Sequence, residues 1–483
     1  MVKFYLNDKE VMANDEDTIW TVAKKNGLTL PHLCFADKPG YRADGNCRAC
    51  MVSIEGERVL AASCIRKPTE GMKVFTEDEK SSKSRKMVLE LLVTDQPNKE
   101  DCHDPDSHFW KMAEKVNVSE SRFDKREKCE VPIADNSHVA MAVNLDACIH
   151  CNLCVRACRE VQSNDVIGMG SRGHSSQVIF DFNDPMGDST CVSCGECVQA
   201  CPTGALMESN LLDEYGKKVV KPDRKVDSLC PYCGVGCQLT YNIKDEKIVS
   251  VDGREGPANQ NRLCVKGRFG FDYVHNPERI TKPLIRKDGV KKDPKERVNP
   301  NNPLTHFREA TWEEALDLAA NKLKKILNDN GDQSLAGFGC AKGSNEEAYL
   351  FQKLVRMGFK NNNVDHCTRM CHASSVAALI ETIGSGAVTA PVSEIKNAEV
   401  AIVIGARPTQ NHPVAATFIK NAIKENDLKL IIMDPRKQDL SRLAEKSLQF
   451  KPGSDVALLN GMLNTIVEEG LADRQYIEKN TEG

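Results

Sequence analysis

The spacing of the cysteines limits what this chain can fold into more than any other feature. Sixteen of its 21 cysteines fall into three sets of closely spaced positions, and all three sets end before residue 265. Disulfide frameworks belong mostly to short secreted chains, whereas this chain has 483 residues and its start, MVKFYLNDKE, does not resemble a signal segment. Tight C-x-x-C clusters in such a chain predict metal ligation in a reducing, cytoplasmic compartment. Thiolates are the soft ligands that iron–sulfur clusters require.

The second set is the most specific of the three. It consists of two C-x2-C-x2-C-x3-C runs, and Pro202 follows the second run. In two-cluster ferredoxins the fourth cysteine of each run ligates the cluster of the other run. The spacing therefore predicts one [4Fe–4S] cluster on Cys148, Cys151, Cys154 and Cys201, and another on Cys191, Cys194, Cys197 and Cys158. Zinc is the alternative metal for these cysteines, although zinc sites usually have other spacings.

The first and third sets are less regular. The first set, with two close cysteines in a Gly-Asn-Cys-Arg-Ala-Cys loop, suits a [2Fe–2S] cluster and comprises Cys34, Cys47, Cys50 and Cys64. The third set comprises Cys230, Cys233, Cys237 and Cys264. Lys266 follows this set and is either a solvated lysine or a positive bridge from a cluster to a neighbouring cofactor. Zinc remains an alternative for both sets.

Five cysteines stay outside the three sets: Cys102, Cys129, Cys340, Cys367 and Cys371. Cys102 and Cys129, with His103 and His108 between them, could suggest a further metal site. Their spacing matches no compact motif, so we interpret them as structural residues.

Composition and patterning predict a multidomain α+β and α/β protein. The net charge of −4 favours neither a nucleic-acid nor an anionic-membrane surface, and no apolar run is long enough for a membrane span. The expected segments are a small mixed α/β unit, a mostly helical connector, the paired cysteine runs, the third set and an α/β region, at 1–78, 79–137, 138–220, 225–280 and 281–483. In the last segment, AEVAIVIG and LKLIIMDPR predict strands of a Rossmann-like parallel sheet, and Thr311 with Glu314 predicts a capped helix.

Two longer stretches resemble a known family. CPYCGVGCQL with NRLCVKGRFG is similar to the opening domain of molybdenum or tungsten bis-pterin oxidoreductases, and NNVDHCTRMCHASSVAALIETIGSGAVT resembles the active-site segment of formate dehydrogenases. The whole chain resembles the catalytic α subunit of cytoplasmic, NAD-linked formate dehydrogenases, with a β-grasp [2Fe–2S] ferredoxin module in front. The front modules are also similar to the large iron–sulfur subunit of respiratory complex I.

The resemblance implies cofactors and site residues. The cofactors would be one [2Fe–2S] cluster, three [4Fe–4S] clusters and molybdenum or tungsten bis(molybdopterin guanine dinucleotide). Cys371 would ligate the metal, His372 would act beside it, and Lys266 would bridge the pterin and the third-set cluster. The implied pterin contacts, which ordinary loop chemistry could equally explain, are Gly405, Arg407, Pro408, Asn411, Asp434, Arg436, Gly453, Ser454 and Asp455.

The implied activity is reversible oxidation of formate to carbon dioxide. Electrons would pass to diaphorase-type flavin and iron–sulfur subunits that reduce NAD, or to a ferredoxin. The alternatives are another bis-pterin enzyme of the nitrate reductase type and an electron-wire subunit without active metal. Two departures from the family stand out: Gln96-Pro97 replaces the start of a histidine/three-cysteine cluster motif, and family members continue well past this chain's length. A fragment or one half of a split subunit is therefore expected.

Overall fold

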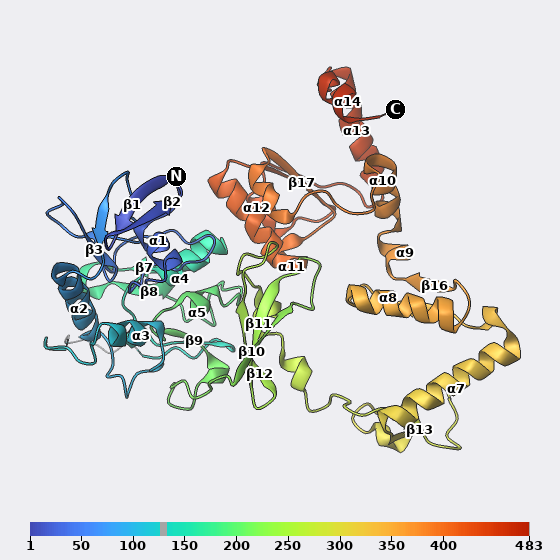
Figure 1. Cartoon of the computed structure of the whole chain (residues 1–483). Coiled ribbons are helices and arrows are strands. Elements are labelled where there is room, and N and C mark those ends of the chain that lie inside the picture. Colours follow the sequence, from blue (N-terminus) through green and yellow to red (C-terminus); the bar gives the residue numbers. More distant parts are fainter. Residues whose placement is uncertain (126–132, 483) are drawn as a thin grey trace. The chain divides into compact units, whose positions relative to one another are not determined.

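The computed structural model describes residues 1–125 and 133–482. They form two units, one of Met1–Phe269 with Val392–Gly483 and the other of Gly270–Pro391 (Figure 1). The segment predicted as one domain, 281–483, thus divides between both units at Val392. Cys129 lies outside the described residues.

The first unit begins with a mixed five-stranded sheet of order β2-β1-β5-β3-β4. Its strands are β1 (Val2–Leu6), β2 (Lys9–Ala13), β3 (Met51–Ile54), β4 (Ala61–Ala62) and β5 (Lys73–Phe75). β1 pairs antiparallel with β2 and parallel with β5. Asn7 and Asp8 connect β1 to β2 with φ angles of 49° and 63°, which suit the two-residue type I′ turn of a hairpin.

Helix α1 (Ile19–Lys25) packs on this sheet, within the segment predicted as a small mixed α/β unit. Thr18 caps its start, because the Thr18 hydroxyl accepts a hydrogen bond from the Thr21 N–H at 3.2 Å. The buried side chains of α1 share one hydrophobic core with Cys50 and Cys64. The sheet and its helix therefore hold part of the first cysteine set in place.

The connector is less helical than its sequence suggested. Helices α2 (Glu79–Val93) and α3 (His108–Lys115) form, and a loop joins them. Leu89, Phe109 and Trp110 pack in one core with Leu33 and Ala49, which flank the first cysteine set. The connector therefore forms part of the wall around that set.

The paired cysteine runs fold into two matching halves. The strand pairs are β6 (Met141–Val143) with β9 (Leu206–Glu208), and β7 (Ile167–Gly170) with β8 (Gln177–Phe180). Each run enters a short helix, α4 (Leu153–Arg156) or α5 (Glu196–Ala200). Just before these helices Asn152 and Gly195 have φ angles of 62° and 68°, so the backbone repeats as the sequence does. A π-helical turn, Ala157–Val161, continues α4.

The third cysteine set belongs to an antiparallel sheet of β10 (Arg224–Leu229), β11 (Gln238–Lys244) and β12 (Lys247–Gly253). Helix α6 (Val265–Phe269) follows. After residue 391 the chain adds a parallel sheet of β17 (Val400–Ile404), β18 (Lys429–Met433) and β19 (Lys446–Leu448), as expected for its two apolar runs. The helices of this part are α11 (Pro408–Asn411), α12 (Pro413–Glu425), α13 (Asp455–Glu468) and α14 (Arg474–Asn480). Ala422 of α12 packs on Leu430 and Ile432 of β18.

The second unit has little core of its own. Its strands are β13 (Leu284–Arg286), β14 (Phe307–Glu309), β15 (Gly337–Gly339) and β16 (Val364–His366), paired as β13–β14 and β15–β16. Its helices are α7 (Trp312–Asn330), α8 (Asn345–Lys353), α9 (Thr368–Cys371) and α10 (Ala373–Ile383). Among the described residues of this unit, Val355 is the one fully buried hydrophobic side chain.

Candidate iron–sulfur and pterin sites

The four cysteines of the first set bring their sulfur atoms together. Cys34, Cys50 and Cys64 are at most 1% exposed, and the Cys47 N–H donates to the Cys34 sulfur at 3.4 Å. Hydrogen bonds from the Cys47 and Cys64 thiols hold the pKa of Cys34 far below its ordinary value. A shared negative charge among buried sulfurs is the electrostatic setting that a metal cluster neutralises.

The second set separates into two groups that cross between the runs. Burial raises the pKa of Cys154 well above its ordinary value, and the next contributions come from Cys151, Cys148 and Cys201. Cys201 belongs to the other run, so the two runs exchange their fourth cysteine in space. These four cysteines are the set expected from two-cluster ferredoxins.

The other group contains the remaining four cysteines of both runs. Burial raises the pKa of Cys194 to about 12, with smaller contributions from Cys158 and Cys191. Burial raises the pKa of Cys197 well above its ordinary value. The charges of Cys194 and Cys191, of Cys154 in the neighbouring group and of Cys158 raise it further. Cys154 and Cys197 also share one hydrophobic core, so the two groups are neighbours.

Backbone N–H groups point at the sulfur atoms in both halves. The His150 N–H donates to the Cys148 sulfur and the Ser193 N–H to the Cys191 sulfur, each at 3.4 Å. His150 and Ser193 both adopt positive φ angles, 52° and 56°, which turn these N–H groups toward the sulfurs. Such donors stabilise negative charge on thiolates and tune cluster potentials.

The third set lines a cavity of about 280 Å³ together with part of the segment that was predicted to bind a pterin. Burial, followed by the charges of Cys230, Cys233 and Cys264, raises the pKa of Cys237. The cavity is lined by all four cysteines, by Lys266 and by residues 410–414. Lys266 and Asn411, which were both predicted from the sequence as site residues, therefore line the same cavity.

A larger cavity of about 560 Å³ adjoins the same residues in the first unit. Cys194, Cys264 and Lys266 line it together with Gln410 and Arg442. It thus touches one ligand from the second set and one from the third. Arg442 was not predicted from the sequence, because nothing in its local pattern distinguishes it from a solvated arginine.

The other expected pterin contacts cluster at the ends of the parallel strands. Gly405 follows β17 with a φ of 57°, and the buried Asp434 follows β18 and accepts a hydrogen bond from the Arg436 N–H at 2.8 Å. The Nε of Arg407 is buried and has no hydrogen-bond partner among the described residues. An unpaired buried guanidinium N–H fits an incoming phosphate oxygen. Ser454 and Asp455, after Gly453, open helix α13.

Cys371 and His372 lie in the second unit. Cys371 ends α9 and His372 precedes α10, and both residues are exposed. The Cys371 N–H donates to the Cys367 carbonyl at 3.2 Å, and the His372 N–H donates to the Thr368 carbonyl at 2.8 Å. These backbone hydrogen bonds hold Cys371 and His372 at the break between helices α9 and α10.

The connector residues considered as a further metal site have separate partners. The thiol of Cys102 donates to the Lys99 carbonyl at 3.0 Å, and His108 donates from Nε2 to the His32 carbonyl at 2.8 Å. His103 contacts the Gly216 carbonyl and the Asp146 carboxylate. Within residues 1–125 and 133–482, no three His, Cys, Asp or Glu side chains are arranged to hold a single metal ion.

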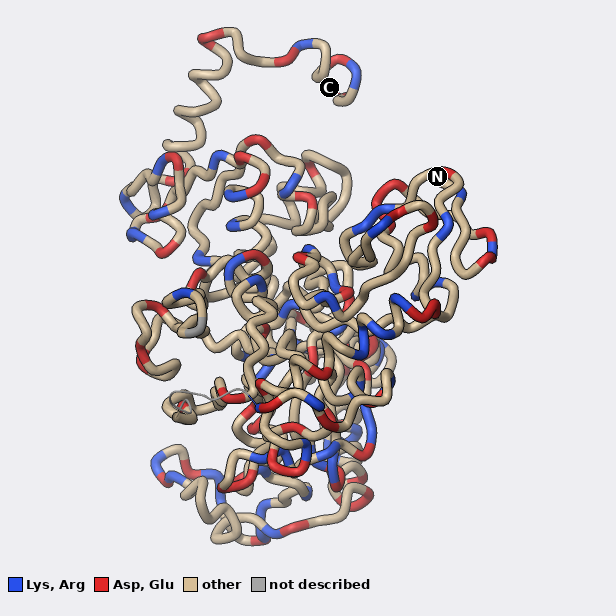
Figure 2. The backbone as a smooth tube through the Cα atoms, turned by 90° about the vertical axis from the view of Figure 1, so that its left-hand side faces the viewer, with Lys and Arg blue, Asp and Glu red and all other residues tan. Residues whose placement is uncertain are grey.

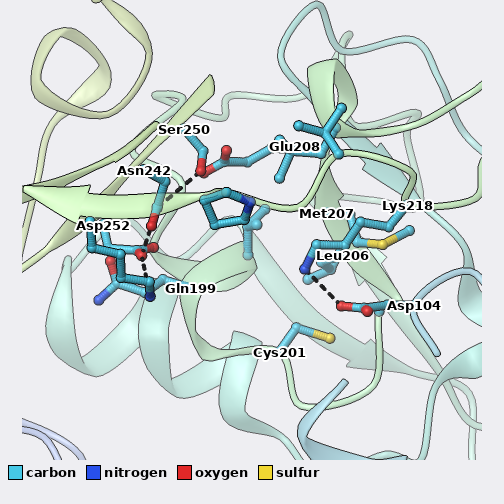
Figure 3. Close-up of a pocket in the computed structure, with 16 residues that line it drawn as sticks. Asp104, Gln199, Cys201, Leu206, Met207, Glu208, Lys218, Asn242, Ser250 and Asp252 are labelled. Atoms are coloured by element: carbon cyan, nitrogen blue, oxygen red, sulfur yellow. Dashed lines mark hydrogen bonds and ion pairs between the residues drawn. The ribbon is translucent and has the colours of Figure 1, made fainter. Parts of the chain in front are cut away.

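A polar cavity of about 260 Å³ lies beside Cys201 (Figure 3). Lys218 and Asp104 form an ion pair across it at 3.0 Å, and Asn242 donates to Asp252 at 2.9 Å. Glu208 is 6% exposed, and burial raises its pKa to about 7. One Glu208 oxygen has no hydrogen-bond partner among the described residues, which suits a water molecule in the cavity.

The distribution of charged residues and the apolar content of the helices bear on which surfaces the chain could contact. Lys and Arg are interspersed with Asp and Glu along the whole chain (Figure 2), whose net charge is −4. Over the described ranges, no helix combines the length and apolar content needed to cross a membrane.

Four family descriptions match successive parts of the chain. They are a 2Fe-2S iron–sulfur cluster binding domain over residues 1–79, a 4Fe-4S dicluster domain over 147–205, a molybdopterin oxidoreductase Fe4S4 domain over 223–276 and a molybdopterin oxidoreductase over 279–477. At this level the expected [2Fe–2S], [4Fe–4S] and pterin domains are confirmed.

Individual relatives cover the whole chain at low identity. The oxidoreductase YjgC of Bacillus subtilis (strain 168), named provisionally, is 30% identical over 99% of this chain and 50% of its own length. A provisionally named formate dehydrogenase of Staphylococcus haemolyticus (strain JCSC1435) is 29% identical over 94% of this chain and 48% of its own length. The chain thus spans about half the length of the curated relatives it matches.

Among solved structures, an NAD+-reducing [NiFe]-hydrogenase is 26% identical, with a TM-score of 0.40, over 43% of this chain and 87% of that one. The superfamily of this chain is inferred from the family matches and not from this structural likeness. They support the molybdopterin oxidoreductase superfamily for this chain, with [2Fe–2S] and [4Fe–4S] domains ahead of its pterin domain.

Proposed function

We propose that this chain is the iron–sulfur portion and part of the pterin portion of a formate dehydrogenase, which oxidises formate to carbon dioxide reversibly. The observation that carries the proposal is the cavity in which Lys266 and residues 410–414 face the third cysteine set. It supports contact between a cluster and a pterin. The provisional name of the Staphylococcus haemolyticus relative and the residues around Cys371 favour formate as the substrate.

Each candidate site residue would have a separate role in this reaction. When bound, the metal and its pterins would take two electrons from formate, and the clusters would carry electrons singly. Cys371 would ligate the metal through its sulfur, and His372 would accept the released proton at an imidazole nitrogen. Lys266 would place a positive charge between the pterin and Cys264. Arg407, with its unpaired Nε, would hold a phosphate of the dinucleotide arms.

The proposed partners are electron acceptors. The chain would deliver electrons from its N-terminal cysteine sets to diaphorase-type flavin and iron–sulfur subunits that reduce NAD, or to a ferredoxin. A cytoplasmic setting is proposed because thiolate-ligated clusters require reducing conditions.

The proposal is tested on the protein produced from its complete reading frame and purified without oxygen. We expect iron, acid-labile sulfide and either molybdenum or tungsten, with formate-dependent reduction of a dye. Nitrate turnover without formate turnover would instead indicate an enzyme of the nitrate reductase type. Iron and sulfide without molybdenum or tungsten would indicate an electron-wire subunit.

A matched pair of variants tests the role of Cys371 in the same protein. Cys371→Ser should abolish formate oxidation while leaving the iron content unchanged. Cys367→Ser is the control, because Cys367 is an exposed cysteine at the start of the same helix, α9. Equal activity in both variants would remove Cys371 from the proposed active site.

A further inference from the structure

The side chain of Lys420 is buried where helix α12 contacts the segment after Cys158. It is 8% exposed, and its Nζ donates to the carbonyls of Gln162 at 3.0 Å and Ser163 at 2.9 Å, and to the Asn164 side-chain oxygen at 2.8 Å. An ammonium group has three donors and no acceptor, so three oxygen acceptors match its charged form.

All three acceptors of Lys420 are neutral. Two other cations of the first unit have an acidic partner: Lys424, one turn further along α12, pairs with Asp165 at 2.6 Å, and the buried Arg268 lies 3.6 Å from Glu196. A buried charge is costly unless an opposite charge lies close to it. Burial, followed by the charges of Lys424 and Arg442, lowers the pKa of Lys420 to about 8, so the group stays mostly protonated at neutral pH, and an anion nearby would stabilise its charge.

The cysteines of the second set are placed to supply that anion. The sulfurs of Cys194 and Cys158 raise the pKa of Lys420, against the larger effect of burial. Asn164, which holds the ammonium, donates its N–H to the Cys158 carbonyl at 2.9 Å. Lys420 also lines the 560 Å³ cavity with Cys194, Cys264 and Lys266. A cluster held by four thiolates would therefore have this ammonium beside it.

We propose that Lys420 is the counter-charge of the [4Fe–4S] cluster held by Cys158, Cys191, Cys194 and Cys197, and that it raises the reduction potential of this cluster. Reduction adds one electron and changes no bond, and a fixed positive charge stabilises the added negative charge. The cluster facing the third set is thereby made the better electron acceptor of the ferredoxin pair. This role rests on the proposed cluster ligation and does not depend on formate as the substrate.

The test is an anaerobic redox titration of the protein with dithionite, followed by electron paramagnetic resonance, after iron and acid-labile sulfide have been measured. In Lys420→Met we expect one [4Fe–4S] signal to need a lower potential. At a fixed potential its oxidised-to-reduced ratio should rise at least tenfold, or 59 mV for a one-electron couple. Lys420→Arg should restore the ratio to within twofold of wild type.

A second variant covers the case in which Lys420→Met fails to assemble its clusters. Asn164→Asp keeps an oxygen acceptor in the same place and adds a negative charge, so it should shift the same signal in the same direction. Unchanged signals in assembled Lys420→Met or Asn164→Asp, a shared shift of all clusters, or equal shifts in the Met and Arg variants would overturn the role of Lys420. Absence of iron and sulfide from the wild-type protein would instead overturn the proposed ligation itself.

Discussion

Cys201 distinguishes a crossed from an uncrossed arrangement of the ferredoxin ligands. It is the last cysteine of the second run, but burial and then the charge of Cys201 raise the pKa of Cys151, ahead of the charge of Cys148. We therefore expect Cys201→Ser to impair the cluster of Cys148, Cys151 and Cys154, lowering the iron content by up to four atoms per chain. Iron analysis and the loss of one [4Fe–4S] resonance would measure this effect.

The control for Cys201 is a buried cysteine outside the three sets. Cys102 is 2% exposed, and its thiol donates to the Lys99 carbonyl. Cys102→Ala should leave the iron content unchanged. An uncrossed arrangement would instead make Cys201→Ser perturb the resonance that Cys191→Ser perturbs.

Residues whose chemistry repeats at short range are the ones that the sequence brings forward as candidates. Ligand cysteines recur within a few positions of one another, so their spacing alone anticipates the groups that the structure brings together. Lys420 and Arg268 could not be found this way. Lys420 binds Gln162, Ser163 and Asn164, which precede it by more than 250 positions, and no local pattern records such partners.

At the scale of helices and strands, the sequence pattern predicted the elements, but tertiary contacts determined details such as the side-chain partners at their ends. The strands β17 and β18 follow from their apolar runs, and Thr311 caps α7 as expected. The capping box is incomplete, however, because the Glu314 carboxylate pairs with Arg308 instead of returning to the Thr311 N–H. The π-helical turn Ala157–Val161 was also missed, since sequence periodicity does not separate a π-turn from an α-helix.

His103 ties three elements together and makes the stability of the connector depend on pH. Its two ring nitrogens contact the Gly216 carbonyl at 3.0 Å and the Asp146 carboxylate at 3.2 Å, and a histidine that donates from both nitrogens is protonated. The hydrogen bond to Asp146 raises the pKa of His103. Its stabilisation is thus complete below the unfolded pKa of about 6.5 and is lost as pH rises through the higher folded pKa.

The variant His103→Gln tests this dependence by thermal unfolding between about pH 5.5 and 9, on proteins with equal iron content. We expect the difference in Tm between wild type and variant to be largest at the acidic end and to shrink as pH rises. His108→Gln should give the opposite trend, because burial lowers the pKa of His108 and wild type is penalised as pH falls. A difference for His103→Gln that is independent of pH would contradict the ion pair.

For the whole molecule, the two units differ in how completely they bury their functional residues. Cysteines of the first and second sets lie in hydrophobic cores, whereas Cys371 and His372 are exposed on a unit whose helix α7 buries no residue. The sequence predicted α7 as a capped helix, and in the structure its apolar residues are not buried, with Trp312 67% exposed. An apolar stripe indicates that a face can be buried, but not which surface covers it.

The difference between the units predicts how residues 1–483 behave when purified alone. The buried cysteine sets should take up iron and sulfide, because the cores around them are complete. Formate oxidation requires a site that excludes water, and Cys371 is open to solvent. We therefore expect little pterin and no formate-dependent dye reduction, alongside normal iron–sulfur resonances. Pterin fluorescence after release and a formate assay measure both quantities, and robust turnover by these residues alone would show that the second unit encloses its active site unaided.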